Sequence, residues 1–375
     1  MPIRIFHTAD LHLGMKFTRG YSPEVQDNLI QGRFETLVRM VGMANHRGCD
    51  LFIIAGDLFD HPTLPKKEVL RVAEALKGFE GGCVLILPGN HDPIQKGEDH
   101  LWTRFQGAMS ERTLILENPA PYDLRPFGID AIIYAGPCTA KHSASNAIGW
   151  VRGVRKDPGP IFHIGVAHGS LEGISPDFNR DYYPMSLEDL NHSGLDLWLM
   201  GHTHIRYPDR QEGTENRIFF PSTPEPDGFD CRHPGYSWLI ELREDKSIYY
   251  QSIQTGYFQF LTLEKEVCTE EDVEALKSYF RKLSRARHLV KLELKGRVPG
   301  QVFNEKSALI QELNKCVLHL EYDVSELLRE ITAEEIDREF TEGSFPHRLL
   351  KTLSREQQSP LSLQIAYDLI QRVKS

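Results

Sequence analysis

Short apolar runs, each followed by glycine or polar residues, recur along the first two-thirds of the chain. Five of them have the length of a buried β-strand and cover residues 3–7, 51–55, 83–87, 161–167 and 195–200. Runs without polar alternation are typical of strands buried on both faces, and the segments between them have helical periodicity. One such helix opens at Ser22 and Pro23. Its inward-facing stripe is expected to be Ile30, Phe34, Leu37, Val38 and Val41. The pattern predicts a layered α/β domain over residues 1–256.

The pattern changes from residue 257. Up to residue 324 it predicts the order strand, helix, strand, helix, strand, with a helix start at the capping box Thr269–Asp272. Residues 325–375 are polar and helical, and a last helix opens at Ser359 and Pro360. Its apolar stripe is Leu363, Tyr367, Ile370 and Val373. We therefore expect a small α+β domain at 257–324 and a helical tail at 325–375. The stripe of that tail either docks on a partner or packs on the chain itself.

Residues that can bind metal ions follow the five apolar runs. They lie in Asp10-Leu-His12, Gly56-Asp57-Leu-Phe-Asp60, Gly89-Asn90-His91-Asp92 and Gly201-His202-Thr-His204, with His168 between the last two motifs. Because ligands gather where such strands end, we expect these side chains to meet in one cleft, where neighbouring glycines let the backbone turn. Two carboxylates, one amide and four imidazoles form the ligand set of a two-metal site that cleaves phosphoesters. Any one of these residues alone has an ordinary structural explanation, such as a helix cap for Asp57, but the joint set in this order does not.

Charge and geometry indicate how the ligands divide between two ions. A carboxylate can bridge two cations, and Asp57, central in the order, is the predicted bridge. Asp10, His12 and one of the two final histidines would complete the first ion, and Asn90, His168 and the other final histidine the second. Mixed oxygen and imidazole ligands suit manganese, iron or zinc better than calcium, and no cysteine falls in a motif. Two aspartates neutralise only half of the metal charge, so the site should attract an anion.

With these motifs the chain resembles calcineurin-like metallophosphoesterases, and more narrowly the SbcD-type nuclease subunits of DNA-repair complexes. The resemblance spans roughly residues 3–255 and includes the turn Pro221-Ser-Thr-Pro224. It implies a sandwich of two central sheets flanked by helices, with a small capping domain at 257–324. By motif it also implies that Asp10, His12, Asp57 and His204 hold the first ion. Asp57, Asn90, His168 and His202 would then hold the second. His91 would protonate the leaving oxygen or stabilise the pentacovalent phosphorus.

Two positions depart from related patterns. Some members of the family place a second histidine three residues after the bridging aspartate, where this chain has Asp60 followed by His61. Phosphoprotein phosphatases carry an arginine after the second motif and a glutamate at the end of the third, where this chain has Asp60-His61-Pro62 and Asp92. The second departure argues against protein dephosphorylation.

Length, charge and cysteine usage limit the remaining possibilities. The chain has 375 residues, enough for one large and one smaller domain, and no apolar stretch approaches the roughly 20 residues of a membrane span. The first predicted strand begins almost at Met1, and the six cysteines are scattered, so we expect reduced thiols in a cytoplasmic protein. The net charge is −10, but Arg281, Lys282, Arg285 and Arg287 lie in a basic segment that either contacts DNA phosphates or forms a solvated face.

Together these patterns and the resemblance predict metal-dependent hydrolysis of DNA phosphodiesters by the nuclease subunit of a repair complex. The resemblance implies two divalent ions, with Mn(II) first and Fe or Zn as alternatives, and an SMC-like ATPase partner of SbcC type held by C-terminal helices. A homodimer is a further expectation. Two alternatives stay open: a phosphodiesterase of the same fold that acts on a cyclic nucleotide or nucleotide pyrophosphate, and a catalytically silent scaffold that binds DNA or a partner.

Overall fold

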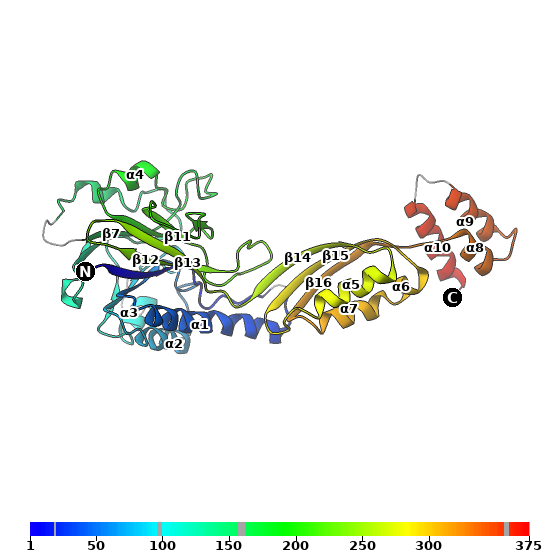
Figure 1. Ribbon diagram of the computed structural model, residues 1–375, viewed down its shortest axis with the longest axis horizontal. Coiled ribbons are helices and arrows are strands. Elements are labelled where there is room, and N and C mark those ends of the chain that lie inside the picture. Colours follow the sequence, from blue (N-terminus) through cyan, green and yellow to red (C-terminus); the bar gives the residue numbers. More distant parts are fainter. Residues whose placement is uncertain (19, 96–99, 157–161, 356–359, 375) are drawn as a thin grey trace. The chain divides into compact units, whose positions relative to one another are not determined.

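A computed structural model describes every residue of the chain except 19, 96–99, 157–161, 356–359 and 375. The chain forms two compact units, Met1–Phe258 and Gln259–Ser375 (Figure 1). The finer division of the second unit into a capping domain and a helical tail stays a prediction.

Two β-sheets form the centre of the first unit. The seven-stranded sheet has the order β10-β13-β12-β1-β2-β3-β4. Its strands are β1 (Ile3–Thr8), β2 (Leu51–Ala55), β3 (Cys83–Leu87), β4 (Thr113–Ile115), β10 (Glu212–Gly213), β12 (Tyr236–Leu242) and β13 (Ile248–Gln254). The six-stranded sheet has the order β5-β6-β7-β8-β11-β9. Its strands are β5 (Pro121–Asp123), β6 (Ala131–Gly136), β7 (Phe162–His168), β8 (Leu197–Gly201), β9 (Arg206–Tyr207) and β11 (Ile218–Pro221).

Side chains alternate between the two faces of each strand and so build separate layers of core. On β2, Ile53 faces the second sheet and packs with Ile133 and Leu197. Its neighbours Phe52 and Ile54 point the other way, into a cluster with residues of the helices. These helices are α1 (Pro23–His46), α2 (Lys66–Lys77) and α3 (Leu101–Gln106). Three short helices connect strands of the second sheet along the chain: η1 (Arg125–Phe127), η2 (Gly149–Gly153) and α4 (Leu187–Asn191). The predicted sandwich of two central sheets flanked by helices is confirmed.

The apolar pattern located most of these elements correctly. β2 and β3 have the predicted bounds, and Ser22 caps α1 by accepting a hydrogen bond from the backbone N–H of Val25 at 3.4 Å. Residue 161, the predicted start of β7, and residue 359, the predicted cap of the last helix, lie outside the described residues. The prediction that Val38 faces inward is wrong, because its side chain is 57% exposed. The buried stripe of α1 instead continues through Leu37, Met40 and Val41, one helical turn apart, and leaves Val38 at its edge.

The second unit contains a three-stranded parallel sheet, in the order β14-β15-β16. Its strands are β14 (Gln259–Glu266), β15 (His288–Val298) and β16 (His319–Arg329), and the helices between them are α5 (Glu270–Phe280), α6 (Gly300–Asn304) and α7 (Lys306–Asn314). Val273 and Leu276 of α5 pack in one cluster with Leu292 of β15. The predicted order of strands and helices is confirmed, except that two helices, α6 and α7, stand where one was predicted. The prediction that the chain is helical from residue 325 is wrong at its start, because β16 continues to Arg329. The capping box is confirmed, because Thr269 and Asp272 each accept the other's backbone N–H.

Three further helices end the chain: α8 (Ala333–Glu339), α9 (Phe345–Arg355) and α10 (Pro360–Lys374). Leu363, Tyr367 and Ile370 of α10 pack in a common core with Ile336, Phe340 and Leu350. The apolar stripe predicted from the sequence therefore serves the packing of these helices and is not free for a partner. Val373, predicted on the same stripe, is 89% exposed. It belongs instead to an exposed apolar face of α10 that consists of Leu361, Ile365, Leu369 and Val373.

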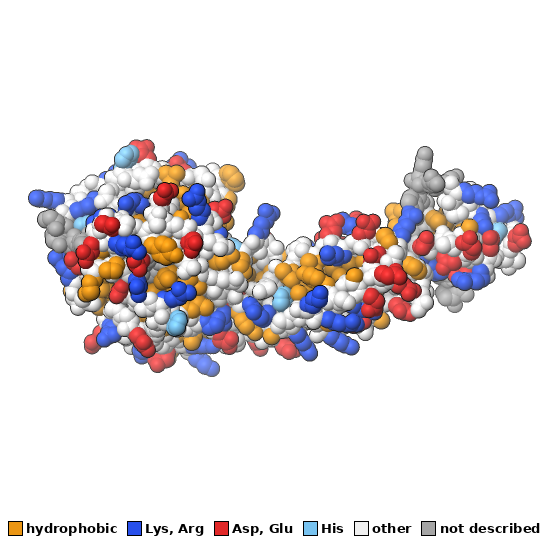
Figure 2. Space-filling view, viewed as in Figure 1, with side chains coloured by type: hydrophobic (Ala, Val, Ile, Leu, Met, Phe, Trp, Pro, Cys, Tyr) orange, Lys and Arg blue, Asp and Glu red, His pale blue; other side chains and the backbone are white. Residues whose placement is uncertain are grey.

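The surface charge, the cysteines and the helix lengths complete the description of the fold. On the face shown in Figure 2, basic and acidic side chains are interspersed over the first unit. All six cysteines are free thiols, as their scattered spacing predicted. Within the described part of the chain, no helix combines the length and apolar character that a membrane span requires.

Candidate metal centre

The seven predicted ligands lie at the carboxyl ends of five strands. Asp10 and His12 follow β1, Asp57 follows β2, and Asn90 follows β3. His168 is the last residue of β7, and the segment after β8 carries His202 and His204. Because β1, β2 and β3 run parallel, as do β7 and β8, their carboxyl ends meet at one edge of each sheet. The stacked sheets bring the two edges together, and all seven side chains come within reach of one another.

Four of these side chains surround a first half-site. The Nε2 atoms of His12 and His204 lie 3.3 Å apart. His204 Nε2 lies 3.9 Å from Asp10 Oδ1, and His12 Nε2 lies 3.8 Å from Asp57 Oδ2. These spacings are those of donor atoms around a common cation about 2 Å from each.

The second half-site shares Asp57. His168 Nε2 lies 3.3 Å from Asp57 Oδ2 and 2.9 Å from Asn90 Oδ1. His202 Nδ1 lies 2.9 Å from the same Asn90 oxygen. These distances place His204 beside His12 in the first half-site and His202 beside Asn90 in the second. Asp57 presents a single oxygen to both, because its Oδ1 accepts the backbone N–H of His91 at 2.8 Å.

Four ligand residues have a backbone that side-chain-bearing residues rarely adopt. The φ angles of Asp10, His12, Asp57 and His202 are +56°, +46°, +50° and +93°. Such conformations cost on the order of 1–3 kcal/mol each and persist only where surrounding contacts impose them. Backbone hydrogen bonds between the first two motifs do so here, from Asp10 N to Gly56 O at 3.1 Å and from His12 N to Asp57 O at 3.0 Å. The Asp10 carboxylate in turn accepts the backbone N–H of His202 at 3.0 Å.

Two motif glycines make room for the ligands. A Cβ atom on Gly89 would lie 2.1 Å from Asp57 Oδ1, and one on Gly56 would lie 1.9 Å from His168 Nδ1. Gly56 also has a φ of +98°, as expected for a turn. Gly89 does not have a positive φ, so it is required for the close approach of a carboxylate and not for a turn.

The electrostatics of the centre fit divalent cations. Burial opposes the charged form of Asp57, but His168, His12 and His91 outweigh it and hold the pKa of Asp57 well below its ordinary range. Burial likewise opposes a charged His168, yet the Asp57 carboxylate raises its pKa to about 9. The pKa of His202 falls to about 3 because of burial and the nearby His168. A proton on His168 therefore occupies a position that a cation would take over on binding.

Two carboxylates outside the predicted ligand set stand behind the histidines of the first half-site. Asp60 Oδ1 lies 3.5 Å from His12 Nδ1, on the side away from the metal-facing Nε2. Asp227 Oδ2 lies 3.5 Å from His204 Nδ1 in the same relation. Burial opposes a charged His204, but Asp227 and Asp10 raise its pKa above the ordinary value. Asp227 lies three residues after the Pro221-Ser-Thr-Pro224 turn, and none of the sequence motifs includes it.

Two other buried groups hold the motif loops. Asp92 is fully buried and accepts the backbone N–H groups of Phe59 at 2.9 Å and Gly89 at 2.7 Å. Burial and the neighbouring Asp57 raise the pKa of Asp92 to about 7. Arg33 of α1 was not singled out by the sequence, yet its buried guanidinium donates to the carbonyl of Leu11, between two ligands, at 2.8 Å.

His91 lies at the edge of the centre. Its Nδ1 is 3.1 Å from the carbonyl oxygen of Asp60, which can only accept a hydrogen bond, so Nδ1 carries the hydrogen and Nε2 is left for other partners. The ring meets that of His12 edge-on, with the centroids 4.7 Å apart. Its side chain is 35% exposed, so an incoming substrate can reach it.

The predicted DNA-contacting residues Arg281, Lys282, Arg285 and Arg287 lie in the second unit, between the end of α5 and the start of β15. Arg281 Nη2 pairs with Glu312 Oε1 at 2.9 Å. Part of the positive charge of this segment is thus neutralised within the chain.

Comparisons with known proteins bear on this arrangement. The family model described as calcineurin-like phosphoesterase matches residues 3–206. An uncharacterised metallophosphoesterase of Bacillus subtilis, YhaO, is 30% identical over 68% of this chain, which spans 58% of that relative's length. The DNA double-strand break repair protein Mre11 of Methanopyrus kandleri is 26% identical over 85% of this chain and 70% of its own length.

Solved structures give weaker similarities. The protein TT1561 of Thermus thermophilus matches 68% of this chain and 100% of its own, with a TM-score of 0.38 and 11% identity. A dimetal phosphatase from Danio rerio matches 68% of this chain and 99% of its own, with a TM-score of 0.34 and 11% identity. The family model covers more than half of the chain and includes every residue of the two half-sites, and the chain belongs to the calcineurin-like phosphoesterase family.

Proposed function

We propose that the chain hydrolyses DNA phosphodiesters with two divalent metal ions, as a nuclease subunit of SbcD type. The observation that carries this proposal is the pair of half-sites that share Asp57 Oδ2, within 3.3 Å of His168 Nε2 and 3.8 Å of His12 Nε2. A pair of bound divalent ions supplies a nucleophilic hydroxide at neutral pH and stabilises charge on the phosphorus and the leaving oxygen. Manganese is the proposed metal, with iron or zinc as alternatives, because the donors are oxygen and imidazole nitrogen.

The positive net charge of the proposed site, with two divalent ions bound, favours an anionic substrate. Asp10 and Asp57 are both buried and are the only carboxylates among the seven proposed ligands. Their two negative charges offset half of the charge of two divalent ions, and a phosphodiester would offset more of it.

His91 is the proposed proton donor. Its backbone N–H donates to Asp57 Oδ1, and its Nδ1 hydrogen-bonds the Asp60 carbonyl oxygen. These two contacts fix the ring beside the bridging ligand and leave Nε2 without a role in holding the ring. A protonated Nε2 at that position can donate to a leaving oxygen, or to a non-bridging oxygen as charge develops there.

The second unit favours DNA over a small nucleotide. The match to the Methanopyrus repair protein covers 85% of this chain, more than the 258 of 375 residues in the first unit, so it extends into the second. A long substrate can use contacts outside the catalytic unit, whereas a cyclic nucleotide does not need them. In this proposal Lys282 and Arg285, both exposed, contact DNA phosphates, with Arg287 and the partly neutralised Arg281 beside them.

The exposed face of α10 is the proposed docking surface for an SMC-like ATPase of SbcC type. Leu361, Ile365 and Leu369 recur every fourth residue and are 56%, 51% and 55% exposed. An amphipathic helix with such a face commonly lies on a partner. Ile365→Glu with Leu369→Glu should abolish co-purification with the ATPase and leave the melting temperature unchanged, because both side chains lie outside the core of the C-terminal helices. Loss of folding in this double variant, or retained co-purification, would contradict the docking surface. A homodimer and a cytoplasmic location stay predictions.

One assay tests the catalytic proposal. Purified protein with manganese is offered labelled single-stranded, double-stranded and hairpin DNA beside a cyclic dinucleotide, with a chelator and the Asp57→Ala variant as controls. We expect DNA cleavage that both controls abolish. Hydrolysis of the cyclic dinucleotide without DNA cleavage would favour the small-substrate alternative. Metal binding without hydrolysis of any substrate would favour the silent scaffold.

A further inference from the structure

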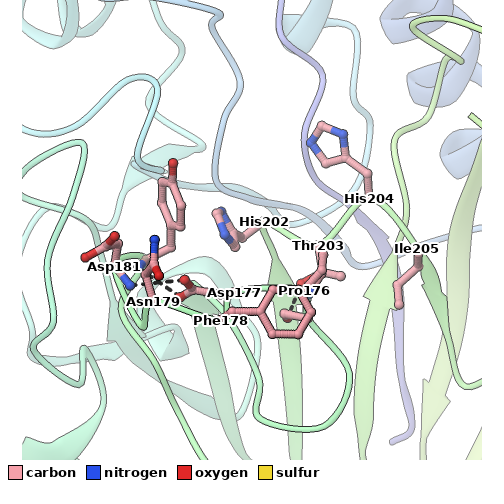
Figure 3. Close-up of a pocket in the computed structure, with 11 residues that line it drawn as sticks. Pro176, Asp177, Phe178, Asn179, Asp181, His202, Thr203, His204 and Ile205 are labelled. Atoms are coloured by element: carbon pink, nitrogen blue, oxygen red, sulfur yellow. Dashed lines mark hydrogen bonds between the residues drawn. The ribbon is translucent and has the colours of Figure 1, made fainter. Parts of the chain in front are cut away.

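A hollow of about 570 Å³ adjoins the metal centre (Figure 3). It lies in the first unit, between residues 175–182 and residues 202–205, and the ligands His202 and His204 form part of its wall. A group bound in this hollow would therefore sit next to a phosphodiester held at the two half-sites.

The segment at the rim of the hollow exposes an aromatic side chain. Phe178 is 95% exposed, and Ile205, on the opposite segment, is 45% exposed. Water contact with a whole aromatic ring is unfavourable, so a ligand that covered Phe178 and Ile205 would gain free energy by removing apolar surface from water. Among the residues that line the hollow, Phe178 offers the largest free flat surface.

The segment that carries Phe178 is tied to the ligand-bearing segments. Asp177 accepts hydrogen bonds from Ser170 Oγ at 2.7 Å and from the backbone N–H of Tyr182 at 3.1 Å. The Ser175 hydroxyl hydrogen-bonds the Thr203 hydroxyl. Ser170 lies two residues after His168, and Thr203 lies between His202 and His204, so the loop and the half-sites share one framework. The distance from the Phe178 loop to a bound phosphate is fixed by the fold before any substrate arrives.

A second ring lines the hollow beside the ligands. The Tyr182 ring lies 5.0 Å from the His202 ring at an interplanar angle of 34°, and 4.9 Å from the His142 ring. Tyr182 thus contacts two imidazoles and borders the hollow next to the second half-site. The hollow is therefore bounded by flat rings near the metals and at the rim.

The charge of the lining argues against a second phosphate. It includes the carboxylates of Asp177 and Asp181, and none of the described residues that line it is Lys or Arg. A flat, uncharged group with ring faces fits this environment better than another anion.

From these observations we propose that the hollow is a subsite for one unpaired nucleobase next to the scissile phosphodiester, stacked on Phe178. The proposal rests on the DNA-cleaving function and adds to it a preference for substrate. A base can stack on a protein ring only when it has left the base-paired stack. The enzyme should therefore cut most readily where DNA is single-stranded or frayed at the cut.

Three variants and two kinds of substrate test this subsite. Phe178→Ala removes the stacking surface, Phe178→Trp enlarges it, and Phe345→Ala removes a phenylalanine of the second unit that is 75% exposed. Stacking of one base contributes a factor of about 5–150 in binding. On a single-stranded oligonucleotide with a fixed cleavage position, Phe178→Ala should lower kcat/KM by that factor. Phe178→Trp and Phe345→Ala should leave kcat/KM near the wild-type value, and all four proteins should hold the same amount of metal.

The matched substrates carry an abasic residue on one side or the other of the cleaved bond. When the abasic residue is at the position that occupies the hollow, the wild-type kcat/KM should fall to the value that Phe178→Ala shows on intact DNA. The kcat/KM of Phe178→Ala should be the same on this abasic substrate as on intact DNA. If Phe178→Ala cuts intact DNA as fast as wild type does, or loses the same factor on both abasic substrates, the base subsite is wrong while the nuclease function stands. If the wild-type protein cuts no DNA at all, both proposals fail.

Discussion

The carboxylate of Asp227 makes the first half-site sensitive to a single substitution outside the ligand set. Asp227 Oδ2 lies 3.5 Å from His204 Nδ1, and His204 Nε2 faces the half-site. A carboxylate in this position keeps the imidazole proton on Nδ1 and leaves the Nε2 lone pair for a metal. Asp227→Asn keeps the shape of the side chain and removes its charge.

The expected loss follows from the asymmetry between the half-sites. Removing such a partner weakens metal binding by about 10–100-fold, which is about 1.4–2.8 kcal/mol. In the second half-site, the Nδ1 of His168 faces the carbonyl oxygen of Ala55 at 2.8 Å and no carboxylate. The substitution should therefore weaken one of the two ions by this factor and change the other by less than about threefold.

Manganese titration of the metal-free protein measures both affinities. Asp227 also raises the pKa of His204, so its removal reduces competition from protons and partly hides the loss at low pH. The titration should be done at mildly alkaline pH, where competition from protons for His204 is small. Asp245→Asn is a matched control, because Asp245 is an exposed aspartate bonded only to Ser247 among the hydrogen bonds of the described residues. Equal weakening of both ions, or no weakening of either, would refute the proposed role of Asp227.

Three further outcomes follow from the centre and the second unit. Asp57→Ala should lose both ions together, whereas His91→Ala should keep both and lose turnover, as elemental analysis and the nuclease assay would show. The pKa of His168 is raised to about 9, so its pairing with Asp57 stabilises the metal-free protein below about pH 6.5 and is lost as pH rises through 9. Thermal melting of the metal-free protein should show a lower melting temperature at pH 10 than at pH 6.5, and His168→Gln should reduce this difference. Reversing the charge of Arg281 and Arg285 should weaken DNA binding. The slope of log K against log salt concentration should become shallower by about 0.9 for each phosphate that the variant no longer neutralises. An unchanged slope would mean that the segment is a solvated face.

The sequence predicted the parts of the fold and site that depend on local pattern. The uninterrupted apolar runs of β2 and β3 gave their bounds, because strands buried on both faces need no polar alternation. The motifs predicted that the candidate ligands gather at strand ends, because each motif follows an apolar run. They left open which of His202 and His204 belongs with Asp10, and only the family resemblance assigned these two residues. The apolar pattern of α10 was recognised, but which partner its stripe meets depends on the packing of α8 and α9, which periodicity does not encode.

Residues that act through distant contacts could not be found in this way. Asp227 is separated from His204 by 22 residues and meets it only because β11 returns beside β8. Arg33 looks like one of many basic residues on a helix, yet folding buries it against a ligand loop. Phe178 belongs to no apolar run and no motif, so its meaning depends on the hollow next to it. Function in these cases arises from the tertiary arrangement and not from residue type or spacing.

The metal centre destabilises the chain that carries it. Four ligand residues have positive φ angles, and Asp10 and Asp57 are carboxylates with at most 1% exposure that face the same space. In the metal-free chain, a protonated imidazole such as that of His168 relieves part of their mutual repulsion. Two divalent cations held by these residues would relieve the same repulsion more completely and would displace that proton, because the carboxylates and the Nε2 atoms of His12, His168 and His204 would donate to them. Folding therefore prepares a strained, charged centre at the strand ends, and metal binding there would supply free energy that stabilises this arrangement.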